Sequence, residues 1–466
     1  MSFTTTAAVL VMIMLGTSTT PLAQEATTPL EQEATTFLAP EVRTGIGYTL
    51  GYSDNINLTP QKESSFINTL FVDLSSSRTS SFVDAAIAGR IGYEQYSNKT
   101  QDSQPIVNLQ ANAKFKLSPW IDWVVENNAA QISQDAASPD VPNNQEIQNV
   151  FQTGPDLLFK FNPVTYLGYS LRYGNYYFTE TTEDNNQRVL NGLRLMYLFT
   201  DKLVVSLNSI YQDAYYQENK NSFFNSDFNR LDVSLGLARI DDLTSFRLAI
   251  GKTYADQQGL ETPDSLLFCT SLTRRLTSDS YFRLAYSRAL TELDLTSSGV
   301  TCDTPTLSLV DPFQSLIGAT FASATNVGNN SASNKLFVED KFEAFYSKIL
   351  NPSIVTVGIS TINGVGNSLE FEAADQSDEQ NVYLTFSYPF ANSTIGTNVT
   401  YSKQTDFDEL FINLGYVYSL NSKTSLGLGY SFDKTIDGGG GAGNNARDTT
   451  GSATENRVFV TLTYGL

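Results

Sequence analysis

From Val107 to Leu117 the sequence alternates between apolar and polar residues at every position. Successive side chains of a β-strand point to opposite faces, so this segment has one apolar and one polar face. Similar segments of about 10 residues recur along most of the chain, with polar stretches between them. This recurrence predicts an all-β protein, a transmembrane antiparallel up-and-down β-barrel with lipid outside and water inside.

The connections between the predicted strands alternate between two classes. Short ones carry turn residues, as at Asn162-Pro163 and Asn351-Pro352, whereas long polar ones include Gln131–Gln148 and Leu290–Asn334. Outer-membrane barrels have short periplasmic turns and long extracellular loops, so we assign the two classes in this way. About 20 strand-like segments follow from Val42 onward, so we predict about 20 strands, with 18 as the nearest alternative. The number must be even because both chain ends are then periplasmic.

Three segments are predicted along the chain. The longest apolar run, Ala7–Leu15, is too short for a membrane-spanning helix, and we interpret residues 1–23 as a signal peptide. Residues 24–41 are rich in Thr, Glu and Pro and predict a disordered periplasmic segment. Residues 42–466 form the predicted barrel, which we place in the bacterial outer membrane with its lipid as a partner.

Composition excludes several classes of function. The net charge of −20 repels phosphate backbones, so we expect no nucleic-acid partner. The chain contains no His, which excludes a Ser-His-Asp triad, a Cys-His pair and any His-ligated metal site. We expect no enzymatic activity, no cofactor and no metal.

The polar faces of the predicted strands supply candidates for lining the lumen. One interpretation is a conducting wall that binds hydroxyl-rich or acidic sugars; the other is that lumenal charges pair across strands and hold water. The pattern leaves both open. With the apolar faces towards lipid, the candidates are Arg90, Asn108, Gln110, Asn112, Lys114, Lys116, Arg172, Arg194, Arg230, Arg247 and Arg283.

The chain has two cysteines. Cys269 lies towards the extracellular end of a predicted strand, on its inward face, and Cys302 lies in the long loop Leu290–Asn334. Exported proteins fold in an oxidising compartment, so we predict a disulfide between them. Such a bond would tie the loop to the wall, where it could form a constriction.

The segment Gly47–Pro60 reads GYTLGYSDNINLTP and is followed by an acidic Ser-Phe stretch at Glu63–Ile67. Together with the Ser-Pro-Trp turn at Ser118–Trp120, it resembles the β-barrel porin 2 group, especially outer-membrane proteins associated with PEP-CTERM/exosortase and exopolysaccharide systems. Beyond roughly residue 130 the likeness is only architectural. The resemblance implies an outer-membrane location and an association with surface polysaccharide export.

These observations lead to one functional hypothesis and two alternatives. The leading hypothesis is an outer-membrane channel that serves as the exit for a secreted exopolysaccharide, with that polysaccharide and a periplasmic export component as partners. A general diffusion porin is the first alternative. A structural or adhesive barrel, with its lumen plugged by the loop Leu290–Asn334, is the second.

Overall fold

The computed structural model describes residues 41–97, 101–133, 142–216, 227–257, 265–292, 336–365, 378–403, 407–437 and 452–466. The predicted signal peptide, nearly all of the predicted disordered segment, and Cys302 therefore lie outside the described residues. Within these ranges no helix is long and apolar enough to cross a membrane.

The strands are β1 (Glu41–Ser53), β2 (Ser65–Thr79), β3 (Val83–Tyr96), β4 (Gln104–Ser118), β5 (Ile121–Ser133), β6 (Gln145–Asn162), β7 (Thr165–Phe178), β8 (Asn186–Leu198), β9 (Leu203–Tyr216), β10 (Phe228–Ile240), β11 (Thr244–Gln257), β12 (Ser265–Thr277), β13 (Ser280–Glu292), β14 (Leu336–Leu350), β15 (Ser353–Val365), β16 (Asp378–Pro389), β17 (Ser393–Lys403), β18 (Phe407–Ser419), β19 (Thr424–Asp437) and β20 (Ala453–Gly465).

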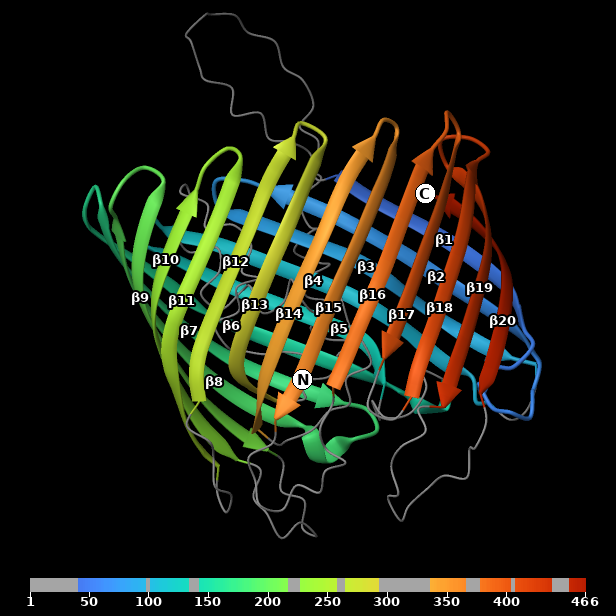
Figure 1. The fold of residues 1–466 in the computed structure, drawn as a ribbon, viewed down its shortest axis with the longest axis horizontal. Helices are drawn as coiled ribbons and strands as arrows, with labels where there is room; N and C mark the ends of the chain where they lie inside the picture. The colour runs from blue at the N-terminus through green and yellow to red at the C-terminus, as the bar shows by residue number, and fades with distance from the viewer. Residues whose placement is uncertain are drawn as a thin grey trace, which may run out of the picture.

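The strands form one closed ring (Figure 1). Each pairs antiparallel with its neighbours in sequence, and β20 closes the ring by pairing with β1 from Gly45↔Gly465 to Ser53↔Arg457. Closure leaves no unpaired strand edge, which a chain in lipid requires because no water is present to satisfy backbone groups. The predicted 20-stranded antiparallel barrel is confirmed.

The connections at the two rims differ in length, as predicted. Those at one rim have two to four residues, and those at the other have three to 43. Asn side chains hold two of the short turns. Asn421 Oδ1 accepts hydrogen bonds from the backbone N–H groups of Lys423 and Thr424 at 2.8 and 2.9 Å, and Asn162 Oδ1 accepts one from the backbone N–H of Val164 at 2.9 Å. The C-terminal end of the chain lies at the rim of short turns (Figure 1).

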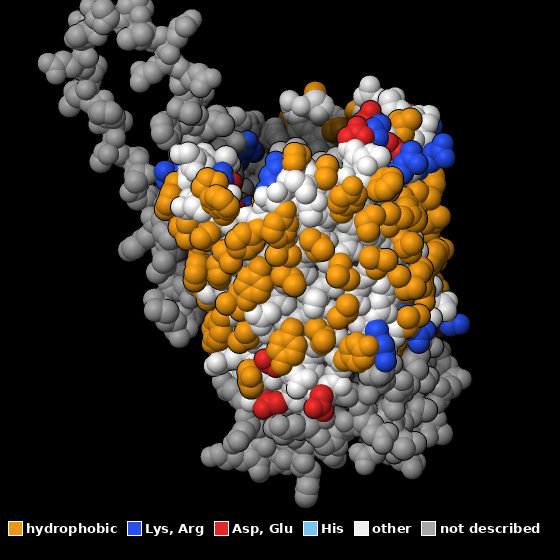
Figure 2. Space-filling model, turned by 90° about the vertical axis from the view of Figure 1, so that its left-hand side faces the viewer, with side chains coloured by type: hydrophobic (Ala, Val, Ile, Leu, Met, Phe, Trp, Pro, Cys, Tyr) orange, Lys and Arg blue, Asp and Glu red, His pale blue; other side chains and the backbone are white. Residues whose placement is uncertain are grey.

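The outward face of the barrel is largely apolar. Leu70 and Leu207 are 59% and 50% exposed although they are large hydrophobic residues, an arrangement that lipid favours and water does not. Figure 2 shows hydrophobic side chains covering the middle of one side, with charged side chains near its upper and lower limits. Next to the short turns the exposed aromatics Trp120, Phe161 and Phe199 occupy the positions of an interfacial girdle.

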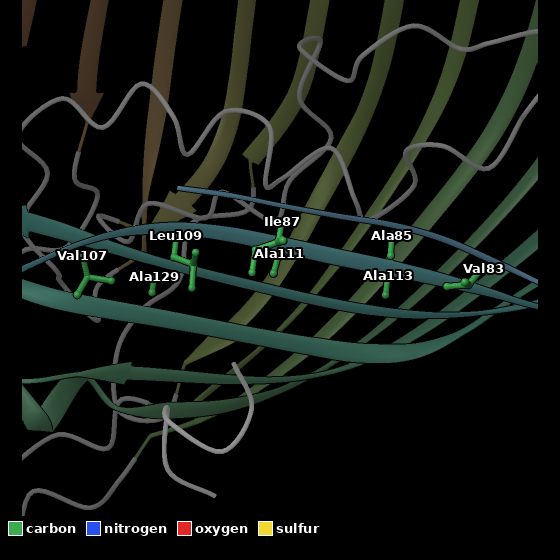
Figure 3. Packing of buried hydrophobic residues seen from close by; sticks show 8 residues of the cluster. All are labelled: Val83, Ala85, Ile87, Val107, Leu109, Ala111, Ala113 and Ala129. Atoms are coloured by element: carbon green, nitrogen blue, oxygen red, sulfur yellow. The ribbon is translucent and has the colours of Figure 1, made fainter. Parts of the chain in front are cut away.

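The apolar residues of β3, β4 and β5 differ from the rest of this outward face. Strand register places Ala113 on the same face as Phe115 and Trp123, and Ile87 on the same face as the exposed Ile91. Instead of being exposed, eight of these residues form a buried cluster (Figure 3). The members are Val83, Ala85, Ile87, Val107, Leu109, Ala111, Ala113 and Ala129.

Candidate functional site: the inward face of the barrel

Strand register places all eleven predicted lumen residues on the face opposite to the exposed hydrophobics. On β3–β5 the charged members pair across strands. Arg90 donates Nε and Nη2 to Asp73 at 2.7 and 3.1 Å, and this guanidinium also lies 3.8 Å from the ring centroid of Phe71. The Lys114 and Lys116 ammonium groups lie 2.9 and 2.7 Å from carboxylates of Asp122 and Asp84, respectively.

Arginines dominate the inward face from β7 to β13. Arg172 Nη2 lies 2.9 Å from Asp156 Oδ2, and both side chains are at most 10% exposed. Arg194 Nε donates to Asn208 Oδ1 at 2.8 Å. This arginine arc consists of Arg172, Arg188, Arg194, Arg230, Arg247 and Arg283.

Carboxylates dominate the inward face from β14 to β20, with Lys341 and Arg457 as cations among them. Strands β10 and β20 lie ten positions apart in a ring of 20, so they stand on opposite sides of the barrel. Arg230 and Glu455 each occupy the third position of their strand, at the same rim. The lumen therefore has a basic and an acidic side. The carboxylate arc consists of Glu339, Glu343, Glu379, Glu409, Asp433 and Glu455.

Sequence reasoning missed Arg188, which is fully buried near the extracellular end of β8. Its Nε donates to Asn186 Oδ1 at 2.6 Å, and its guanidinium lies 4.1 Å from the ring centroid of Tyr176. The strand alternation that identified Arg194 also identifies Arg188, because the two are six residues apart on one strand. Glu126 and Gln152 were also missed, although strand alternation places both on the inward face, together with Asp156.

The segment that carries the family resemblance turns out to close the ring at the extracellular rim. Beyond Ser53 the chain leaves β1, and the Asp54 carboxylate accepts hydrogen bonds from the backbone N–H of Asn456 at 2.7 Å, from Asn456 Nδ2 at 3.0 Å and from Lys62 Nζ at 2.7 Å. Asn55 is buried and donates Nδ2 to the Thr454 carbonyl at 2.9 Å. We call Asp54, Asn55, Lys62 and Asn456 the closure clasp, because they join the two ends of the strand sequence.

The ionisation of Asp54 reflects these contacts. Burial by itself would raise the pKa of this carboxyl. Hydrogen bonds from Lys62 and Asn456 stabilise the charged form and outweigh burial, so the pKa of Asp54 lies below its ordinary value. The closure clasp is therefore held by a carboxylate that stays charged over the whole physiological pH range.

Cys269 faces inward on β12, is 3% exposed and is disulfide-bonded. Its expected partner, Cys302, lies outside the described residues. Across the described strands and turns, no group of three or more Cys, Asp or Glu residues is arranged to hold a metal ion.

No protein-family model and no curated protein matches this chain. Solved structures similar to it include the siderophore receptor PirA from Acinetobacter baumannii, at 8% identity and a TM-score of 0.49 over 91% of this chain and 80% of that one. The ferric enterobactin receptor PfeA from Pseudomonas aeruginosa is similar at 10% identity and a TM-score of 0.47, over 91% and 81% of the two chains. OccK5 (OpdH) from Pseudomonas aeruginosa is similar at 13% identity and a TM-score of 0.38, over 91% and 98%.

Proposed function

We propose that this protein is an outer-membrane channel, and that it serves as the exit for a secreted exopolysaccharide. The observation that supports a channel is the division of the barrel wall into an outward and an inward face of different polarity. Outward residues such as Leu207 are exposed and apolar, whereas polar side chains such as Asn208 and Gln212 lie on the inward face of the same strand. A ring of 20 strands is wide enough to enclose a lumen.

Two features support a polysaccharide as the solute. The segment Gly47–Pro60 resembles proteins of exopolysaccharide systems. The inward amides, such as Asn112 and Gln110, together with the arginine arc, offer donors and acceptors of the kind that hydroxyl-rich or acidic sugars require. A strain that lacks this gene should secrete less polysaccharide while its inner-membrane synthesis continues. Normal secretion from the deletion strain would refute export.

The charged arcs give a direct test of the channel itself. In a planar bilayer with a salt gradient, the purified protein should conduct, and Arg247→Glu should shift the reversal potential towards cation selectivity because it removes a positive charge from the basic side and adds a negative one. Glu343→Gln, which removes a charge from the acidic side, should shift it the other way. Absence of conductance would support the plugged barrel, and conductance that candidate glycans leave unchanged would support a general diffusion porin.

A further inference from the structure

A glycine in the inward face of β6 is surrounded by polar groups whose hydrogen-bonding capacity is incompletely used. Gly154 lies so close to the backbone of β7 that a Cβ there would be 1.9 Å from the Leu171 carbonyl oxygen. Along β6 the inward neighbours on its two sides are Gln152 and Asp156, because inward side chains recur every second residue. On β7, Arg172 lies beside it and donates Nη1 to the Gly154 carbonyl at 3.4 Å.

Glu126 completes this group from β5. It pairs directly with Gln152 across the strands, which places their Cβ atoms about 5 Å apart on the same inward face. We call Glu126, Gln152, Asp156 and Arg172 the Gly154 quartet. They come from three successive strands, and Gln152, Asp156 and Arg172 are between 2% and 8% exposed.

Each member of the quartet has one buried polar atom without a hydrogen-bond partner in the structure. Three of these atoms are acceptors, namely Glu126 Oε2, Gln152 Oε1 and Asp156 Oδ1, and the fourth is a donor, Arg172 Nε. Other polar atoms of the same side chains do have partners. Arg172 Nη2 is 2.9 Å from Asp156 Oδ2, and Gln152 Nε2 donates a hydrogen bond to the Tyr176 hydroxyl at 2.8 Å. Unsatisfied buried groups cost free energy, so four in one place indicate a site that a ligand satisfies.

The mixture of acceptors and a donor identifies the chemical class of that ligand. A cation would satisfy only the three oxygens and would be repelled by the Arg172 guanidinium. An anion would satisfy only Arg172 and would be repelled by Glu126 and Asp156. A hydroxyl group both donates and accepts, so a neutral ligand with several adjacent hydroxyls can satisfy all four atoms.

We propose that the Gly154 quartet is a binding site for a neutral saccharide unit inside the barrel. The site deepens the proposed function, on which its biological use rests, because it names the part of the wall that a polysaccharide contacts. Glu126 is the least buried member of the quartet. Binding itself does not depend on the direction of transport.

Saturation-transfer NMR on the purified full-length protein in detergent micelles tests this site, with maltohexaose as the neutral probe. Wild type should transfer saturation to the sugar, and Gln152→Leu should bind it about threefold to tenfold more weakly, the effect of one lost hydrogen bond. The control is Gln187→Leu, which removes an exposed, outward-facing glutamine from β8 and should bind like wild type. Heat-modifiable migration on electrophoresis shows that each barrel has folded.

Glu126→Gln gives a second, milder variant that keeps the side-chain shape, and it should weaken maltohexaose binding without affecting folding. Equal binding by Gln152→Leu, Glu126→Gln and the control would overturn the site, as would an absence of saturation transfer in wild type. A response to trigalacturonate or CaCl₂ but not to maltohexaose would also overturn it, since it would indicate a charged ligand. Normal polysaccharide secretion by a deletion strain would refute export while leaving this binding result intact.

Discussion

Removing the carboxylate of the closure clasp should loosen the barrel where its two ends meet. Asp54→Ala deprives Asn456 of the acceptor for its backbone N–H and its Nδ2, at 2.7 and 3.0 Å. Hydrogen bonds to a charged group contribute about 1.5–3 kcal/mol each when buried. The Asp54 side chain is 28% exposed, so hydrogen bonds to water replace part of this stabilisation in the variant. The exposed ion pair with Lys62 adds less than about 1 kcal/mol. We expect a loss of about 2–3 kcal/mol for Asp54→Ala.

The assay is equilibrium unfolding by urea in phospholipid vesicles, followed by the fluorescence of Trp120 and Trp123. Because the pKa of Asp54 is lower in the folded protein, its stabilisation is complete above the unfolded pKa of about 3.9 and is lost as pH falls through the folded pKa. The difference between wild type and Asp54→Ala should therefore shrink in that acidic range. A difference below about 0.5 kcal/mol at neutral pH, within the range typical of ordinary surface substitutions, would refute this account of the clasp.

Two further predictions address the two faces of the wall and a glycine that has no room for a Cβ. In a chain with both native cysteines replaced, Asn112→Cys should react with a membrane-impermeant thiol reagent, whereas Leu207→Cys should require a lipid-soluble one; labelling of both by the impermeant reagent would contradict the assignment of faces. Gly154→Ala should lower the free energy of unfolding by about 3 kcal/mol or more, because the new Cβ would lie 1.9 Å from the Leu171 carbonyl oxygen. Gly415→Ala, where nothing lies within 4 Å, is its control and should differ little from wild type in the same urea titration.

Much of the candidate site could be predicted because side-chain direction in a strand is a local property. On β4 the alternation alone assigned Asn108 and Lys114 to one face, and the register of the neighbouring strands agrees with it. Burial was not predictable in this way. Leu109 has the same alternation as the exposed Leu70, yet it is 2% exposed and belongs to the buried cluster on β3–β5.

The sequence by itself determined a barrel wall with two faces, its approximate strand number and the difference between its rims, because a two-residue period and turn chemistry act over a few neighbouring residues. The tertiary structure alone decided which residues meet. Arg172 pairs with Asp156 sixteen residues away, and Asp54 accepts hydrogen bonds from Asn456, near the other end of the chain. Such pairings depend on the register between strands and on the closure of the ring, which are set by the whole sheet and leave no mark in any short stretch of sequence.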